Sequence, residues 1–238
     1  MIVRRTALAA LVAVAGWNFG PAYAQDAKKG TPTNPVGIGS TWNNSVKKEP
    51  GPDGIELDKK QTELLQRVNA YFRDLPDIKG NFVQTTADNK RSRGKFYVKK
   101  PGRFRFDYAA PSKLVIVSDG QYMAVQDHDL NSDDRYQLEQ TPFRVLLRKD
   151  VDLVRDARIL ELQEVDDVIV LSLQDKSPES PGRIKLFLAK KPNLELREWV
   201  TTDAQGLDTR VELQDFSKGD ELDPGLFKPA PIGLKKIQ

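Results

Sequence analysis

The stretch from Gly94 to Met123 constrains the fold more than any other part of the chain. It contains three strand-like runs, separated by short segments with Pro or Gly that are typical of turns. In the middle run, aromatic residues alternate with charged ones, namely Phe104, Phe106 and Tyr108 with Arg103, Arg105 and Asp107. Because successive side chains of a strand point to opposite faces of a sheet, we expect a meander with one aromatic face and one charged, solvated face.

The chain from residue 55 onwards continues this strand-rich pattern. Strands are expected at 79–86, 93–99, 103–108, 113–118, 121–126, 136–138, 158–165, 168–174, 182–189, 194–202 and 207–216. One amphipathic helix is expected over 58–75, where apolar residues recur at helical spacing. Thr141 as N-cap and Pro142 as first helical residue predict a short helix that ends at Leu147. About eleven antiparallel strands with few helices predict a mainly β fold and exclude a parallel nucleotide-binding sheet.

The N-terminus is typical of an export signal. Arg4 and Arg5 precede an apolar run over residues 7–15, and Ala22-Tyr23-Ala24 supplies the small residues that a signal peptidase reads. The run is shorter than the roughly 20 apolar residues that a membrane-spanning helix needs, and no other stretch is longer. We therefore expect a signal peptide over 1–24, general secretion rather than the twin-arginine route, and a soluble mature protein.

Residues 25–54 are rich in Pro, Gly and Asn and carry few apolar side chains, so they are expected to form a flexible linker. Residues 55–238 then form a single domain of about 180 residues with one core. Removing residues 25–54 should change the melting temperature little, because the segment buries few apolar groups. Thermal unfolding of the chain with and without the segment checks this, and a large drop would mean that Trp42 and its neighbours dock on the domain.

Composition argues against several classes of function. The 37 basic and 34 acidic residues give a net charge of only +3, which makes no case for nucleic-acid binding. There are no cysteines, so a disulfide framework, a thiol nucleophile and a lipid-attachment cysteine are all excluded. His128 is the only histidine, and no nucleophile elbow, zinc-type histidine pair or phosphate-binding glycine loop is present. We expect neither enzymatic activity nor a cofactor.

One acidic segment deserves comparison with a calcium loop. Asp127, Asp129, Asn131 and Asp133 alternate like the first half of such a loop. Where the loop needs glycine and a bidentate glutamate, however, this chain has Ser132 and Leu138. A solvated hairpin loop is the favoured interpretation, with a weak adventitious cation site as the alternative, and no metal site is expected.

Several motifs together, in their order and spacing, resemble the LolA-like family of periplasmic lipoprotein carriers. These are GKFYVKKPGRF at residues 94–104 followed by Pro111, IVSDG at 116–120, Thr141-Pro142-Phe143 before Leu146-Leu147, and Phe82-x-Gln84. The resemblance implies an unclosed antiparallel half-barrel whose concave apolar face is covered by short helices. The acyl chains of a lipoprotein would enter between the sheet and this helical lid.

The resemblance also implies candidate site residues. The expected wall of the acyl-chain cavity consists of Phe82, Phe96, Val98, Phe104, Phe106, Tyr108, Leu114 and Ile116. The expected lid consists of Leu64, Val68 and Phe72 on the first helix and Pro142, Phe143, Leu146 and Leu147 on the second. Spacing alone favours an ordinary filled core for these aromatic residues.

The implied function is that of a monomeric carrier in the periplasm. It would bind the acyl chains of lipoproteins released by an inner-membrane ATP-driven complex and deliver them to an outer-membrane receptor or to the membrane itself. The alternative is a regulatory domain on the same half-barrel that senses lipid or lipoprotein. A structural domain with a filled core is the third possibility.

The sequence departs from the family at one position. The family commonly has Lys-Arg-Pro where this chain has Lys99-Lys100-Pro101, and the family's arginine is thought to hydrogen-bond the lid. Lys100 is therefore the expected lid latch, and a weaker one, because lysine lacks the planar fork of donors of arginine. Arg103 or Arg105 could supply such a fork, but both have the opposite strand parity to Phe104 and should point away from the concave face.

Overall fold

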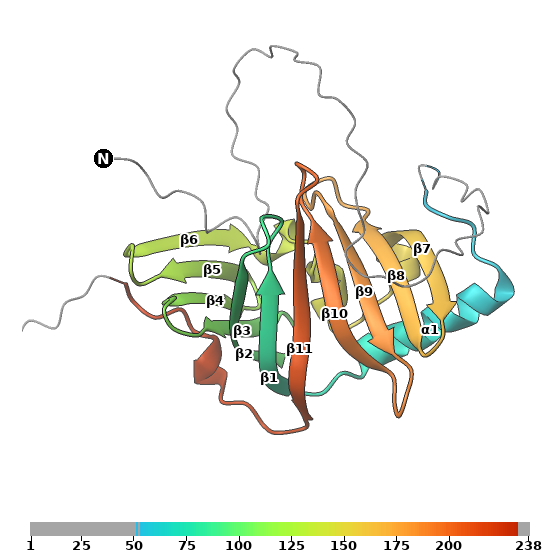
Figure 1. The fold of residues 1–238 in the computed structure, drawn as a ribbon. Helices are drawn as coiled ribbons and strands as arrows, with labels where there is room; N and C mark the ends of the chain where they lie inside the picture. Colours follow the sequence, from blue (N-terminus) through green and yellow to red (C-terminus); the bar gives the residue numbers. More distant parts are fainter. Residues whose placement is uncertain (1–50, 52, 233–238) are drawn as a thin grey trace, which may run out of the picture. The chain divides into compact units, whose positions relative to one another are not determined.

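The computed structural model describes residue 51 and residues 53–232. The expected signal peptide and all but the end of the expected linker lie outside the described residues. Within them, eleven strands form one antiparallel sheet (Figure 1). They are β1 (Ile78–Thr85), β2 (Arg91–Lys99), β3 (Arg103–Tyr108), β4 (Leu114–Asp119), β5 (Tyr122–Asp127), β6 (Ser132–Gln137), β7 (Ala157–Val165), β8 (Val168–Asp175), β9 (Arg183–Ala189), β10 (Glu195–Thr202) and β11 (Asp208–Lys218). The expected mainly β class is confirmed.

The sheet is bent but not closed. Its order is β6-β5-β4-β3-β2-β1-β11-β10-β9-β8-β7, with β6 and β7 at its two ends. Three strands separate β3 from β10, which would put them about 19 Å apart in a flat sheet. The rings of Phe106 on β3 and Trp199 on β10 nevertheless lie 6.2 Å apart between centroids. The sheet must therefore curve around the face that carries these two residues, which we call the inner face.

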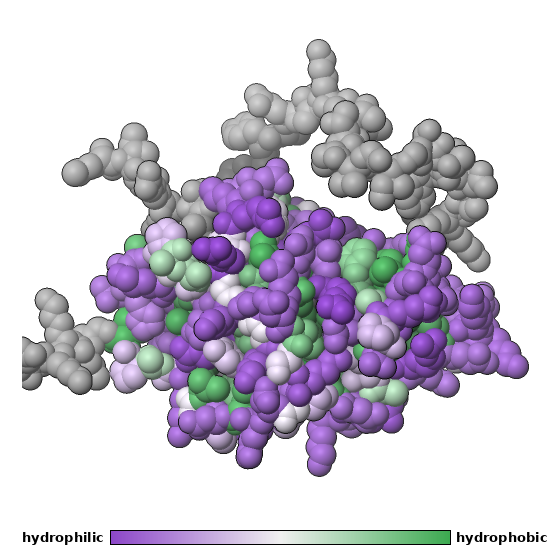
Figure 2. Space-filling model, turned by 60° about the horizontal axis from the view of Figure 1, so that its bottom comes forward, coloured by the Kyte–Doolittle hydropathy of each residue, from purple (hydrophilic) through white to green (hydrophobic). Residues whose placement is uncertain are grey.

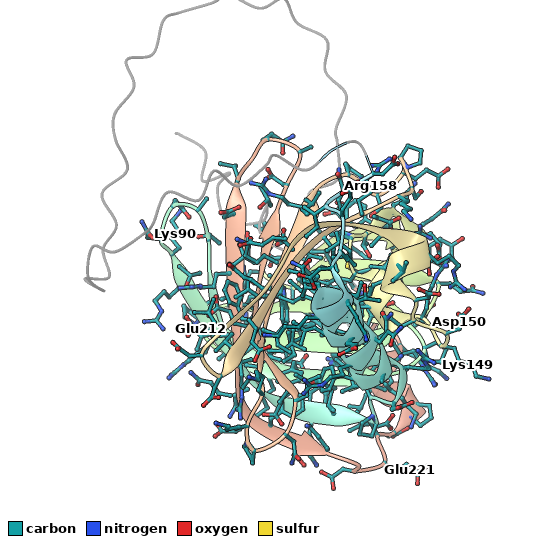
Figure 3. All side chains as sticks on the ribbon, turned by 90° about the vertical axis from the view of Figure 1, so that its right-hand side faces the viewer. Lys90, Lys149, Asp150, Arg158, Glu212 and Glu221 are labelled. Atoms are coloured by element: carbon teal, nitrogen blue, oxygen red, sulfur yellow. The ribbon has the colours of Figure 1, made fainter. Side chains whose placement is uncertain are left out.

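A long helix covers part of the inner face. Helix α1 (Lys59–Arg73) begins at a capping box, in which the Asp58 carboxylate accepts from the Gln61 N–H and the Gln61 side chain accepts from the Asp58 N–H. One stripe of α1 is buried, including Leu65 and Val68, and joins the core of the inner face. In Figure 1 the helix passes behind β8 and β9, and Figure 3 shows it lying across the sheet.

Shorter helices connect β6 to β7 on the same side. They are the 3-10 helix η1 (Leu138–Gln140), α2 (Arg144–Leu147) and α3 (Leu153–Asp156). The expected cap of α2 is wrong. Phe143 occupies the N-cap position without a side-chain hydrogen bond, and the Thr141 hydroxyl instead donates to the Leu138 carbonyl at 2.8 Å. Thr141 is thus used to close η1, which leaves α2 only four residues long.

The outer face differs from the expected solvated surface. Residues 222–230, which include the 3-10 helix η2 (Pro224–Phe227), cross the outer side of β3, β4 and β5. The Arg105 guanidinium donates to the Leu226 carbonyl at 3.1 Å, and the Gln126 amide exchanges two hydrogen bonds with the Ala230 backbone. Val117, Ala124 and Phe227 are buried there and form no part of the inner core. Arg105 of β3 therefore anchors the C-terminal segment on the outer face.

The described surface is largely hydrophilic. Figure 2 shows one face on which apolar residues gather only in small, separate areas. The exposed large apolar residues lie on different segments, with Leu130 in the turn after β5, Val165 at the end of β7 and Leu207 just before β11. Large apolar side chains are thus mostly directed to the two faces described above. No helix in this part of the chain is long and apolar enough to cross a membrane.

Candidate functional site

A wholly apolar cavity lies between the inner face and the two helices α1 and α2. Its volume is about 80 Å³. The lining residues are Phe72, Leu75, Ile78, Phe96, Val98, Phe104, Phe106, Phe143, Leu146, Leu147, Ile184, Leu186, Leu196, Trp199 and Leu213. They come from both helices and from strands on both arms of the bent sheet. The bend of the sheet therefore creates the cavity, and the helices cover it.

Eight of the expected site residues line this cavity. They are Phe96, Val98, Phe104 and Phe106 in the wall and Phe72, Phe143, Leu146 and Leu147 in the lid. On β2 and β3 the alternation of the strand turns the side chains inward, as the sequence pattern predicts. Their role in acyl-chain binding remains a prediction.

The other expected site residues lie outside the lining. Phe82 and Tyr108 pack edge to face at 5.0 Å, and the Tyr108 hydroxyl donates to the Gln84 side chain, so both belong to filled core. Ile116 is buried beyond the cavity, and Leu114, also outside the lining, is half-buried. On the helices, the residues outside the lining are Leu64, Val68 and Pro142. The expected strand residues do have the parity of the inner face, and Leu64 and Val68 do face the core. They lie farther along their strand or helix than the cavity extends.

The sequence interpretation missed almost half of the cavity. Strands β9, β10 and β11 contribute Ile184, Leu186, Leu196, Trp199 and Leu213. Ile184, Leu186 and Leu213 lie at alternate positions of their strands, so their burial was predictable. Leu196 and Trp199 are three positions apart, and the pairing of β10 with β9 is irregular between Leu196 and Glu198, so simple alternation does not predict that both line the cavity. Only the sheet order, which brings β1 next to β11, shows that these strands face β2 and β3 across the cavity.

Aromatic rings dominate the middle of the cavity. Trp199 stands edge to face with Phe106 at 6.2 Å and with Phe143 at 6.1 Å, both at 79°. Phe106 in turn contacts Phe104 at 6.0 Å. Phe143 belongs to the segment that begins α2, so this ring cluster joins the lid to both arms of the sheet. Such contacts favour the closed arrangement in the absence of a ligand.

Lys100 lies where both helices end. Its ammonium donates to the Phe72 carbonyl and, at 3.5 Å, to the Arg73 carbonyl, which are at the C-terminus of α1. Partial burial lowers the pKa of Lys100, and the charge of Asp74 partly opposes this shift. In the same turn, the Gly102 N–H donates to the Leu147 carbonyl at the end of α2. The Lys100 side chain therefore holds α1, whereas the backbone of its turn holds α2.

Neither neighbouring arginine replaces this contact. Arg103 donates to the Lys100 carbonyl at 3.3 Å, and Arg105 pairs with Asp107 on the outer face. This agrees with their strand parity.

Substitutions at Lys100 should change the opening of the lid. Lys100→Arg should slow the entry of a fluorescent acyl probe, because a guanidinium can hold both carbonyls at the end of α1. Lys100→Leu should slow the handover of cargo about ten times more than it slows loading. A factor of this size is expected for the loss of one charge-assisted hydrogen bond. Stopped-flow probe entry and transfer to acceptor vesicles measure these effects. Identical behaviour of all three proteins would remove Lys100 from the mechanism.

An ion pair holds α2 directly. Arg144 makes a two-pronged contact with Asp175 at the end of β8, with Nη2 at 2.7 Å from Oδ1, and its Nη1 donates to Glu139 at 2.7 Å. The Asp175 side chain is fully buried and that of Arg144 is 13% exposed. These carboxylates raise the pKa of Arg144 further. Because both partners are largely desolvated, Arg144 is the strongest polar tie of α2 to the sheet.

The rim of the cavity near α1 is polar. An open groove of about 400 Å³ adjoins it at Leu75 and is lined by Arg67, Tyr71 and Lys218 among others. The Tyr71 hydroxyl accepts from the Leu196 N–H at 3.0 Å, and burial raises its pKa to about 12. Tyr71 therefore stays neutral near pH 7 and fixes α1 to β10.

The acidic segment after β5 forms local contacts. Asp127 accepts the N–H groups of Asp129 and Leu130, Asp129 pairs with Lys113, and Asp133 pairs with Arg135. Among residues 51 and 53–232 there is no group of three or more His, Cys, Asp or Glu residues that could hold a metal ion.

Comparison with known proteins agrees with this architecture. Residues 73–230 match the family model described as "Outer membrane lipoprotein carrier protein LolA". The chain is 29% identical to an outer-membrane lipoprotein carrier protein of Halorhodospira halophila, over 74% of this chain and 86% of the relative. It is also 29% identical to one of Alkalilimnicola ehrlichii, over 68% of this chain and 77% of the relative.

Among solved structures, the LolA superfamily protein NE2245 of Nitrosomonas europaea aligns with a TM-score of 0.43 and 13% identity. The alignment covers 70% of this chain and 97% of that one. The family model spans well over half of the chain, and the chain therefore belongs to the LolA family of outer-membrane lipoprotein carriers.

Proposed function

We propose that this protein is a periplasmic carrier that binds the acyl chains of lipoproteins released from the inner membrane and brings them to the outer membrane. The apolar cavity beneath α1 and α2 carries the proposal. Each methylene buried there contributes roughly 0.8 kcal/mol, so an acyl chain can be held without a specific polar contact. No covalent step is part of this function.

Loading requires the lid to move. A cavity of about 80 Å³ is smaller than the engineered cavity of roughly 150 Å³ that accepts a single benzene. An acyl chain therefore fits only after some of the lining side chains have left. Loading becomes a competition, in which acyl methylenes replace the apolar side chains of the lid on the inner face.

Helix α2 is the element expected to move. It has four residues, of which only Val145 and Leu146 are buried. Helix α1 has fifteen residues and buries a full stripe that includes Leu64, Leu65, Val68 and Phe72. Since displacing α1 would expose far more apolar area, lifting α2 costs less free energy.

The proposed donor is an inner-membrane ATP-driven releasing complex, and the proposed acceptor is an outer-membrane receptor or the membrane itself. Membership of the carrier family supports this route. The end of α1, the other covering helix, is held by the single ammonium of Lys100 without an arginine fork, and a weaker hold of this kind suits delivery with little help from a receptor.

Incubation with inner-membrane vesicles that contain the releasing complex tests the proposal. With ATP, the protein should extract lipoproteins into the supernatant and elute with them on gel filtration; without ATP, it should not. Absence of release in both conditions would contradict a carrier. Capture of a regulatory protein in place of lipoprotein would favour a sensing domain.

A further inference from the structure

Trp199 is the one lining residue of the apolar cavity with a polar side-chain atom. It lies on β10, is 7% exposed, and its ring contacts Phe106 and Phe143. Within the described residues, the indole Nε1 is buried and has no hydrogen-bond partner. A buried tryptophan N–H usually finds an acceptor, because leaving it unpaired costs free energy.

The side chains of the cavity cannot supply this acceptor. Every other lining residue is Phe, Leu, Ile or Val. Phenyl rings stand edge to face with the indole on two sides and are at best weak acceptors. Trp199 therefore carries an unused, buried donor on a residue of the cavity wall, and every other side chain of this wall is hydrocarbon.

We infer that the indole N–H of Trp199 binds a neutral carbonyl oxygen of the cargo, namely the ester or amide group that heads an acyl chain. This inference rests on the proposed function and adds a polar contact to it. The bound lipid supplies the acceptor that the closed protein lacks. Trp199 thereby distinguishes an acylated ligand from a plain hydrocarbon or ether chain.

The chemistry of the cavity selects a neutral acceptor. No lining residue carries a positive charge, so a carboxylate of a free fatty acid would lose its hydration without a counter-ion. An ester or amide carbonyl loses less on desolvation and can be satisfied by a single donor.

The position of Trp199 also connects this contact to opening of the lid. Phe143, at the N-cap of α2, packs against Trp199 in the closed state. When α2 lifts, Phe143 leaves and the indole becomes accessible. The movement that admits an acyl chain thus uncovers the donor.

Two synthetic ligands test the inference. One is a cysteinyl peptide whose glycerol group carries two palmitoyl esters, and the other carries two hexadecyl ethers in their place. Isothermal titration should show that Trp199→Phe lowers the ester-to-ether affinity ratio about fivefold (about 1 kcal/mol), as expected for one neutral hydrogen bond. The control Phe104→Leu, which also alters a lining aromatic residue, should weaken both ligands and leave the ratio unchanged.

A third ligand locates the carbonyl. It carries two ether chains and one amide-linked acyl chain, so a Trp199→Phe effect confined to it would identify the amide as the acceptor. Palmitate itself should bind more weakly than any of the three. An ester-to-ether ratio that is the same in wild type and Trp199→Phe, with no effect on the amide ligand, overturns the inference.

An infrared measurement does not depend on a variant. An isotope-labelled carbonyl bound to the wild-type protein should absorb at lower frequency than the same group in a dry hydrocarbon solvent. An unshifted band for both ester and amide would also overturn the inference. If none of the lipopeptides binds, the proposed carrier function fails, whereas equal binding of all of them leaves the carrier standing and removes only the role of Trp199.

Discussion

Replacing Phe104 by glutamate is expected to weaken acyl-chain binding at least about a hundredfold while leaving the fold largely intact. Phe104 is 4% exposed, points inward from β3 and lines the cavity. A carboxylate at this position would be buried against acyl methylenes without a partner, which costs several kcal/mol. The loss should be visible as a higher Kd for a fluorescent acyl probe.

The effect should depend on pH. Burial in the loaded cavity raises the pKa of the introduced carboxyl group, because the charged form is disfavoured there. Protonation removes the penalty, so binding should strengthen as pH falls and weaken as pH rises through that pKa.

A matched substitution on the other face provides the control for Phe104→Glu. Gln214 is exposed on β11, next to the lining residue Leu213, and Gln214→Glu adds the same charge outside the cavity. It should bind the probe like the wild type. If Phe104→Glu unfolds outright, or binds as tightly as the wild type, then Phe104 is structural core or solvent-facing, and the cavity assignment is wrong.

Removing the arginine of the α2 ion pair is expected to cost about 3 to 5 kcal/mol of unfolding free energy, the usual penalty for leaving a buried charge without its partner. Arg144→Leu would leave the fully buried carboxylate of Asp175 with the Ser177 N–H, at 2.7 Å, as a remaining donor. Because this donor remains, the loss of unfolding free energy should lie near the lower end of that range. Urea unfolding measures it.

The same variant should also load faster. Without Arg144, α2 keeps the Gly102–Leu147 hydrogen bond and its apolar contacts but loses its strongest polar tie. Probe entry should then accelerate. Arg155→Leu is the control, because Arg155 also forms a two-pronged pair, with Asp156, but is 51% exposed. It should change stability and entry far less. Equal effects of the two variants would contradict a special role for Arg144.

The sequence correctly predicted those features of the structure that depend only on neighbouring residues. The alternation in β2 and β3 correctly placed Phe96, Phe104 and Phe106 on the inner face, because parity depends only on neighbouring residues. It could not tell cavity from core among them. Tyr108 has the same parity as Phe104 but lies at the end of β3 beside Gln84, in filled interior.

The features that the sequence did not predict depend on contacts between residues far apart in the chain. Trp199 faces Phe106 only because the sheet bends and β1 pairs with β11. The Arg144–Asp175 pair joins residues 31 positions apart, and the sequence around each residue does not indicate its partner. The C-terminal segment covers the outer face through backbone carbonyls, which carry no sequence signal.

The central claim is that α2 leaves the inner face when an acyl chain enters, and one distance measurement tests it. The chain has no cysteines, so Lys149→Cys and Glu212→Cys introduce two unique sites for spin labels. Figure 3 shows these residues on opposite sides of the domain, with Lys149 exposed just beyond α2. A second pair, Arg158→Cys with Glu212→Cys, reports on the sheet alone. Addition of the dipalmitoyl lipopeptide should lengthen the first distance and leave the second unchanged. An unchanged first distance in a protein that has bound the lipopeptide would contradict the account.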